Sequence, residues 1–219
     1  MDIAVTPLSP AWLAASFLVA AGVLALAVRA APWRRFGSSE AVHVWYGSIF
    51  ALVLLWSVRA VVDTFVVIHL LGTAGFALAA GGPMALIGGA LVVVVVALVH
   101  GTPLANVASV FVLAVALPAA VVLGVLRVTH RFLPDNFFVY AFAVAFLGAA
   151  LGFAASGLAG AAVIAVTGSM DAAVLFGDYV PYLLYLAFAE GTLTGMVLTL
   201  AVVYRPQWVA TFDDARYLQ

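Results

Sequence analysis

The chain has 219 residues, of which 67% are hydrophobic and only 8% are charged. A soluble domain is charged at about a quarter of its positions, because its surface must face water. The composition therefore excludes a soluble globular protein and predicts an integral membrane protein. The absence of cysteine excludes disulfides and thiolate metal sites. A formal net charge of −1, with no basic run, gives no indication of a nucleic-acid partner.

The order of charge and apolar residues at the N-terminus differs from that of a signal peptide. A signal peptide carries positive charge before its apolar run. Here only Asp2 precedes Trp12, and the positive residues Arg29 and Arg34 follow the run. We therefore expect an uncleaved first helix with its N-terminus outside.

The apolar segments predict about seven membrane-spanning helices in an all-α polytopic bundle. A spanning helix needs roughly 20 mostly apolar residues, and the long uncharged stretch 64–126 contains helix breakers at 81–83 and 100–103. The predicted domain covers residues 1–204, and residues 205–219 form a short cytoplasmic tail. Its predicted helices are 11–28, 42–58, 64–80, 84–99, 104–126, 136–167 and 179–204.

The arginines test this count. Cytoplasmic segments of membrane proteins carry an excess of positive charge. With seven crossings and the N-terminus outside, only Arg59 lies outside. The cytoplasmic set is Arg29, Arg34, Arg35, Arg127, Arg131, Arg205 and Arg216. Fusing the third and fourth helices would place five of the eight arginines outside, so the charge distribution favours seven crossings and a cytoplasmic C-terminus.

Two glycine pairs indicate close helix packing. Gly148 and Gly152 are four residues apart in the predicted sixth helix, and Gly88 adjoins Gly89 in the fourth. Small residues let helix backbones approach in lipid. We interpret both pairs as packing positions.

Glu190 lies near the middle of the last predicted helix. A carboxylate at membrane depth costs roughly 2.5–3.5 kcal/mol on insertion scales, so we expect it to face the bundle interior and to have a partner. Asn106 and His69 are candidate partners. One interpretation is that Glu190 orders a binding site, and the other is that it is a structural residue joining two helices.

Two histidines lie toward the outer side of the predicted bundle. His69 is four residues past Phe65 in the predicted third helix, which places it about 6 Å below the outer surface. His100 ends the fourth helix on the same side, and Met1 and Asp2 precede the first helix there. An imidazole, a free amine and a carboxylate could together bind a divalent transition metal. The alternative is that each histidine is an ordinary hydrogen-bonded core or interface residue.

The chain contains no HExxH zinc motif, no GxSxG nucleophile motif and no Walker A motif. We therefore expect neither an enzyme nor a protein with a tightly bound organic cofactor. Any ATP hydrolysis must come from partners.

Four segments resemble the CbiM/NikM-type permeases, the substrate-capture components of energy-coupling-factor transporters for cobalt and nickel. The first is the opening, from Met1-Asp2-Ile3 to Leu8-Ser9-Pro10, which is similar to the family's Met-His-Ile…Leu-Ser-Pro. The others are His69-Leu70-Leu71-Gly72, Ala105-Asn106-Val107 and Glu190-Gly191-Thr192-Leu193-Thr194. They follow the family's order and span nearly the whole chain.

The resemblance implies a multi-pass protein of the bacterial inner (plasma) membrane whose substrate is a divalent transition metal, cobalt or nickel. It implies metal binding at Met1, Asp2 and His69, with Asn106 and Glu190 as supporting polar groups; His100 is a further candidate from its position. It also implies partners, namely a membrane coupling subunit and cytoplasmic ATPases.

The sequence departs from the family at its second position, where Asp2 replaces histidine. Carboxylates suit harder ions such as manganese better than imidazoles do. Two alternatives therefore stay open: a divergent permease for another small solute, and a non-transporting membrane assembly partner.

Overall fold

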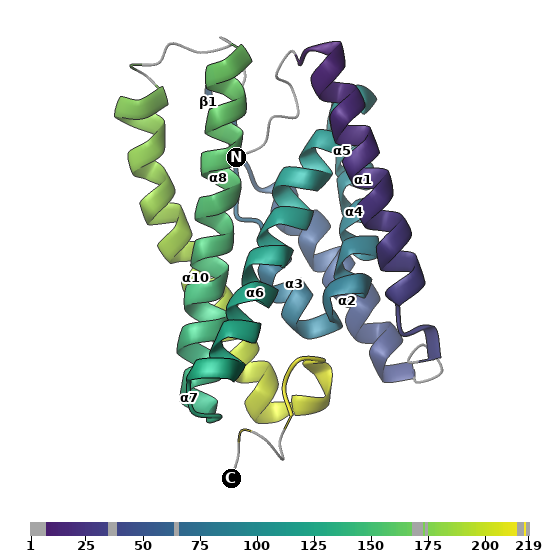
Figure 1. The fold of residues 1–219 in the computed structure, drawn as a ribbon, viewed down its shortest axis with the longest axis vertical. Helices are drawn as coiled ribbons and strands as arrows, with labels where there is room; N and C mark the ends of the chain where they lie inside the picture. The colour runs from purple at the N-terminus through teal and green to yellow at the C-terminus, as the bar shows by residue number, and fades with distance from the viewer. Residues whose placement is uncertain are drawn as a thin grey trace.

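The computed structural model describes residues 8–34, 39–63, 66–167, 173, 175–213 and 217. Long helices run beside one another along its longest axis (Figure 1). Within the described ranges, six helical segments are long and apolar enough to cross a membrane, which confirms the predicted all-α polytopic fold. They are Pro10–Ala30, Glu40–Ser57, Gly82–His100, Leu104–Phe132, Phe137–Thr167 and Leu175–Tyr204.

Helices α1 (Pro10–Ala30), α2 (Ser39–Ser57) and α4 (Gly82–His100) agree with the predicted segments to within a few residues. Ser9 caps α1, because its hydroxyl accepts a hydrogen bond from the Trp12 backbone N–H at 3.3 Å. Gly101 ends α4 in the left-handed conformation (φ 66°), with its N–H bonded to the Ala97 carbonyl. Both ends therefore follow from ordinary capping residues.

The fifth crossing combines several helix types. It consists of η2 (Leu104–Asn106), α5 (Val107–Val110), the π-helical η3 (Phe111–Ala116) and α6 (Leu117–Phe132). Pro118 has no backbone N–H to donate, and the π-helical turn ends two residues before it, at Ala116. The crossing runs six residues past the predicted end at Leu126. Its last turns carry Arg127, His130 and Arg131, which an apolar pattern does not include.

The last two crossings also contain π-helical turns. The sixth is α7 (Phe137–Val139), η4 (Tyr140–Leu147) and α8 (Gly148–Thr167), and the seventh is η5 (Leu175–Tyr179) followed by α10 (Val180–Tyr204). The Asn136 side chain starts the sixth by accepting a bond from the Val139 N–H at 2.9 Å. These bounds match the predicted segments closely.

The predicted third helix, 64–80, is wrong over its first part. Strands β1 (Ala60–Asp63) and β2 (Val66–Ile68) form an antiparallel hairpin with Val61 opposite Val67. Helix α3 covers only Thr73–Ala80. The strands are rich in valine and isoleucine, whose branched side chains favour extended backbone. Residues 64 and 65 lie outside the described part of the chain.

The third segment nevertheless passes between the two ends of the bundle. We call the end where α10 stops and residues 205–213 lie the tail end. Glu40, at the start of α2, accepts hydrogen bonds there from Gln207 and Trp208. The Ala79 carbonyl, at the end of α3, accepts one from the Ala210 N–H. The hairpin follows the other end of α2, so residues 58–80 return the chain to the tail end.

The glycine pairs lie at close helix contacts, as predicted. A Cβ on Gly152 would stand 3.1 Å from the Pro118 carbonyl oxygen, and one on Gly148 would stand 3.0 Å from Val122. On α4, a Cβ on Gly89 would come within 2.3 Å of Val115. Glycine therefore lets α8 approach α6, and α4 approach η3, without a side chain between them.

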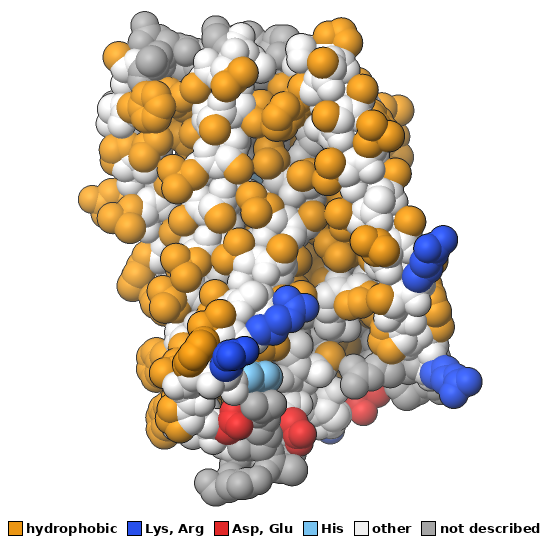
Figure 2. All heavy atoms as spheres, viewed as in Figure 1, with side chains coloured by type: hydrophobic (Ala, Val, Ile, Leu, Met, Phe, Trp, Pro, Cys, Tyr) orange, Lys and Arg blue, Asp and Glu red, His pale blue; other side chains and the backbone are white. Residues whose placement is uncertain are grey.

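Hydrophobic side chains cover most of the face seen in Figure 2, and charged side chains gather toward the tail end. A protein in lipid needs such an apolar outer surface. Large exposed residues on the outer faces of α1 and α10 include Leu18, Leu26, Leu184 and Tyr185.

The tail folds back onto the bundle. Thr211 donates through its backbone and its hydroxyl to the Leu78 carbonyl. The Thr211 hydroxyl is also 2.7 Å from the Tyr140 hydroxyl, and Tyr217 is hydrogen-bonded to His130. The rings of Phe212 and Tyr217 are stacked with centroids 4.9 Å apart. The ends of α3, α6 and η4 are thereby joined.

Candidate functional site

The break in the third crossing lies inside the bundle. Residues 69–72 connect β2 to α3 without regular structure. Gly72 has φ +65°, a left-handed conformation that side chains disfavour. A Cβ there would also meet Leu52 at 2.7 Å and Leu55 at 3.1 Å. Both backbone conformation and space therefore require glycine at the start of α3.

The Glu190 carboxylate holds this break. Its Oε2 accepts a hydrogen bond from the Leu71 backbone N–H at 2.8 Å, and its Oε1 accepts one from the Gly72 N–H at 2.7 Å. The side chain is 1% exposed. The expected interior position is correct, but the two acceptor bonds go to main-chain amides rather than to the side chains of Asn106 or His69.

These two hydrogen bonds satisfy backbone N–H groups that lipid could not. Non-helical backbone at membrane depth must find hydrogen-bond partners within the protein, because lipid offers none. The amides before and at the start of a helix have no partners within that helix, and its dipole favours a negative charge there. One carboxylate therefore satisfies two amides at the beginning of α3 and ties α3 to α10.

Trp56, which lies on α2, stabilises the interrupted segment. Its indole Nε1–H donates to the Leu71 carbonyl at 2.8 Å, and the side chain is 1% exposed. Both the amide and the carbonyl of Leu71 are thus bonded to buried side chains. Thr73 adds a third tie, because its hydroxyl donates to the Ala114 carbonyl at 3.0 Å. The interrupted segment is therefore fixed to α2, η3 and α10.

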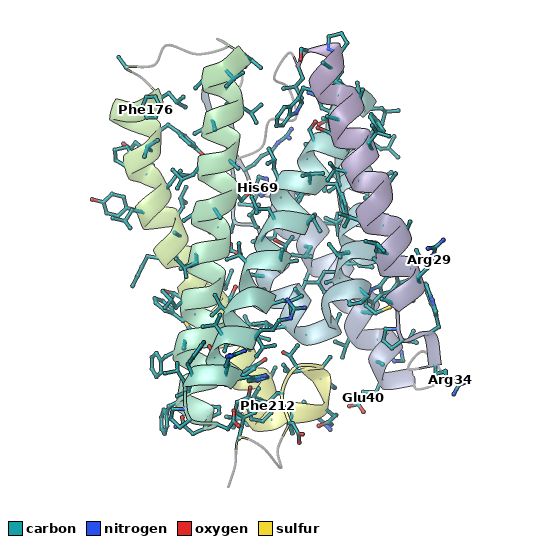
Figure 3. All side chains as sticks on the ribbon, in the orientation of Figure 1. Arg29, Arg34, Glu40, His69, Phe176 and Phe212 are labelled. Atoms are coloured by element: carbon teal, nitrogen blue, oxygen red, sulfur yellow. The ribbon has the colours of Figure 1, made fainter. Side chains whose placement is uncertain are left out.

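His69 begins the irregular segment and is 4% exposed. It lies within the bundle in Figure 3, between the end marked by Phe176 and the tail end marked by Phe212. Its ring centroid is 4.8 Å from that of Trp56. Nδ1 is 2.9 Å from the Leu70 carbonyl, which can only accept, so Nδ1 carries the proton. In the neutral ring the lone pair is then on Nε2, the arrangement usual in metal-ligating histidines.

The sequence pattern predicted that His69 lies in a helix, and this prediction is wrong. His69 instead directly follows strand β2. The extended backbone carries it into the interior, where Trp56 covers one side of its ring.

The other two described candidates begin or end neighbouring crossings. Asn106 closes η2 and is 5% exposed, so it is buried directly before α5. His100 is the last residue of α4 and is partly exposed. Its Nε2 is buried and has no hydrogen-bond partner within the described part of the chain.

The two N-terminal candidates, Met1 and Asp2, lie outside the described residues. Among the residues that are described, no three histidine, aspartate or glutamate side chains gather closely enough to hold a metal ion. The described part therefore supplies one well-placed imidazole and no complete set of side-chain ligands.

The fold and this site define a class: a polytopic helical membrane protein whose third crossing is interrupted beside a buried histidine and held by a buried carboxylate. The chain belongs to the CbiM family, described as the cobalt uptake substrate-specific transmembrane region, which matches residues 2–208. The family resemblance noted in the sequence is thereby confirmed.

Solved structures share the fold. One, described as a transition metal transporter, is 18% identical, with a TM-score of 0.75 over 91% of this chain and 92% of that one. Another, a truncated transition metal transporter, is 17% identical, with a TM-score of 0.75 over 94% of this chain and 99% of that one. A search of curated proteins finds no significant match.

Sequence reasoning missed Trp56 and the role of the main chain. Trp56 appears in sequence only as an aromatic residue near the end of an apolar helix. Gly72, directly after His69-Leu70-Leu71, was the one signal in the sequence, because glycine often marks a change of backbone direction.

Proposed function

We propose that this chain is the substrate-capture permease of an energy-coupling-factor transporter that takes up a divalent transition metal of the cobalt or nickel class. Membership of a family described by cobalt uptake supports this proposal. The observation that carries it is His69, a buried imidazole in a segment that three neighbouring elements hold in place.

In this proposal the metal binds His69 through Nε2, together with the terminal amine of Met1 and with Asp2. Imidazole and amine nitrogens suit cobalt and nickel, whereas the carboxylate also accepts harder ions. Glu190 acts through the main chain, by fixing the segment that carries His69. Asn106 and His100 are supporting polar residues.

The charge distribution supports a cytoplasmic tail end. Arg59 follows α2 at the opposite end of the bundle. The described arginines toward the tail end are Arg29, Arg34, Arg127, Arg131 and Arg205. With the positive end inside, the N-terminus faces outward and the metal arrives from outside. Because the sequence has no Walker A motif, ATPase subunits and a membrane coupling subunit are the proposed partners. The proposed location is the bacterial plasma membrane.

The test is metal binding to purified protein carrying a C-terminal tag, measured by calorimetry with nickel and cobalt. His69→Ala is expected to weaken binding at least tenfold, because it removes a nitrogen ligand. A short N-terminal extension is expected to do the same, because it moves the amine. His43→Ala, an exposed histidine at the tail end, is the control and retains wild-type affinity.

Unchanged binding in both variants would remove this site. Absence of binding for every divalent metal tried would instead favour one of the two alternatives, another small solute or a non-transporting assembly partner. Uptake assays with and without the coupling subunit then separate those two.

A further inference from the structure

An apolar groove runs along the outer surface between α2 and α10, with α3 as its floor. Its volume is about 290 Å³. We call it the α2–α10 groove. Its apolar walls are formed chiefly by Leu52, Leu55, Phe76, Leu193, Val197 and Leu198.

The groove exists because the face of α3 beneath it carries small residues. Gly72, Gly75 and Ala79 line the floor. They recur at intervals of three and four residues and therefore share one side of the helix. The floor is therefore set back from the larger side chains of α2 and α10 that line the groove.

A second, more polar cavity of about 650 Å³ adjoins the groove toward the tail end. We call it the head cavity. Ser48 and Ala51 line both spaces, so the two adjoin at these residues. Glu40, His43, Arg205 and Trp208 line the head cavity as well. A slot that is apolar at one end and charged at the other matches an amphipathic ligand.

The two full charges of the head cavity have opposite signs. Arg205 is exposed and lines the head cavity. On the carboxylate side, Glu40 Oε1 accepts hydrogen bonds from Gln207 at 3.1 Å and from Trp208 at 2.8 Å. A guanidinium binds phosphate oxygens well, and a carboxylate binds an ammonium group. One cation and one anion together match a zwitterion better than a purely anionic head group.

The length of the site corresponds to one lipid leaflet. From Leu193 to Arg205 along α10 the rise is about 18 Å. Half of the hydrocarbon core of a bilayer is about 15 Å. A lipid whose chain lies beside Leu193 therefore has its head group level with Arg205. Trp208, which also lines the head cavity, is a residue typical of the membrane interface.

We propose that the α2–α10 groove and the head cavity form a binding site for a phospholipid with a primary-amine zwitterionic head group, of the phosphatidylethanolamine class. An acyl chain lies in the groove over Gly75. The phosphate binds Arg205, and the ammonium group binds Glu40. The bound lipid covers the half-exposed side of α3, the short helix whose start is held by Glu190.

The test uses the full chain, delipidated in detergent and titrated separately with dioleoyl phosphatidylethanolamine, phosphatidylcholine and phosphatidylglycerol. Native mass spectrometry counts the bound lipid, and thermal unfolding reports its effect on stability. We expect phosphatidylethanolamine to bind at least fivefold more tightly than the other two. Phosphatidylcholine has no N–H donor for Glu40, and phosphatidylglycerol has no positive charge.

Three variants test the parts of the site. Ala51→Phe fills the junction and Arg205→Gln removes the phosphate partner, and each is expected to weaken phosphatidylethanolamine binding at least fivefold. Glu40→Gln is expected to abolish the preference over phosphatidylcholine. The controls are Ala25→Phe and Arg29→Gln, at exposed positions of α1 toward the tail end, which keep wild-type binding.

Equal binding of the three lipids to the wild-type chain would overturn the proposal, as would unchanged phosphatidylethanolamine binding in both Ala51→Phe and Arg205→Gln. A third overturning result is that Ala51→Phe leaves lipid binding intact but prevents assembly with the coupling subunit. The groove would then be a seat for a partner helix.

Discussion

Glu190 and Gly72 are 118 residues apart in the sequence, yet the carboxylate of one accepts the backbone N–H of the other at 2.7 Å. This contact joins the middle of the last crossing to the start of a half-length helix in the third. Interrupted helices in transport proteins commonly lie at binding sites, because their ends expose polar backbone groups. Here the exposed backbone groups are bonded to protein side chains, and His69 precedes them.

The first prediction concerns this carboxylate. Glu190→Gln keeps one acceptor oxygen but turns an NH₂ group toward the second amide. We expect a folded protein whose free energy of unfolding falls by about 1–3 kcal/mol, the range for a buried amide left without a partner. Metal binding should weaken as well, because the segment carrying His69 loses one tie. Thermal unfolding and metal titration of the same preparation measure both effects.

Thr192→Val is the matched control for this variant. Its hydroxyl bonds within α10, to the Phe188 carbonyl, and not to the interrupted segment. A Glu190→Gln protein with wild-type stability and metal affinity would show that the carboxylate charge is not needed.

The second prediction concerns Gly72. An alanine there must adopt φ +65° and place its Cβ 2.7 Å from Leu52. The backbone conformation alone costs roughly 1–2 kcal/mol, and the contact adds to it. We expect Gly72→Ala to lower the temperature of unfolding and to reduce metal binding.

Gly101→Ala separates the cost of the backbone conformation from the cost of the contact. Gly101 has nearly the same φ, +66°, but a Cβ added there would meet no described atom within 4 Å. The stability lost by Gly101→Ala should therefore reflect backbone conformation alone, and it should be smaller than the stability lost by Gly72→Ala. Equal losses would mean that Leu52 moves aside without cost.

The third prediction concerns Trp56. Phenylalanine keeps an aromatic ring near His69 but removes the indole N–H that bonds the Leu71 carbonyl. A buried carbonyl without a partner costs about 1–3 kcal/mol, so Trp56→Phe should be destabilising by that amount. Trp33→Phe is the comparison, because the Trp33 indole bonds the Val28 carbonyl at an exposed position. If the two substitutions lower the unfolding temperature equally, the buried hydrogen bond to Leu71 stabilises the protein no more than the exposed one to Val28 does.

The fourth prediction concerns orientation. Reporter fusions placed after Arg35, Arg131 and Arg216 should report the cytoplasm, and one near Asp171 should report the outside. The reason is the concentration of arginine at the tail end. Paired alkaline phosphatase and fluorescent-protein fusions measure this directly. An alkaline phosphatase fusion at the C-terminus that is active would contradict the proposed orientation.

The sequence by itself determined the membrane class, the helical architecture and most helix bounds. These properties depend on local composition, since some 20 apolar residues in a row have few stable alternatives to a spanning helix. It also determined the close contacts at Gly89 and Gly152, because small residues in an apolar helix have a narrow range of uses.

Only the tertiary structure decided the form of the third crossing and the partners of Glu190. The stretch 64–80 has the apolar composition of a spanning helix, and its β-branched residues and Gly72 disfavour a helix without excluding one. A half-length helix is stable there because Glu190 and Trp56, from two other crossings, bond the backbone groups that the break exposes. Such bonds depend on which segments meet in space, so the residues at the break do not reveal them.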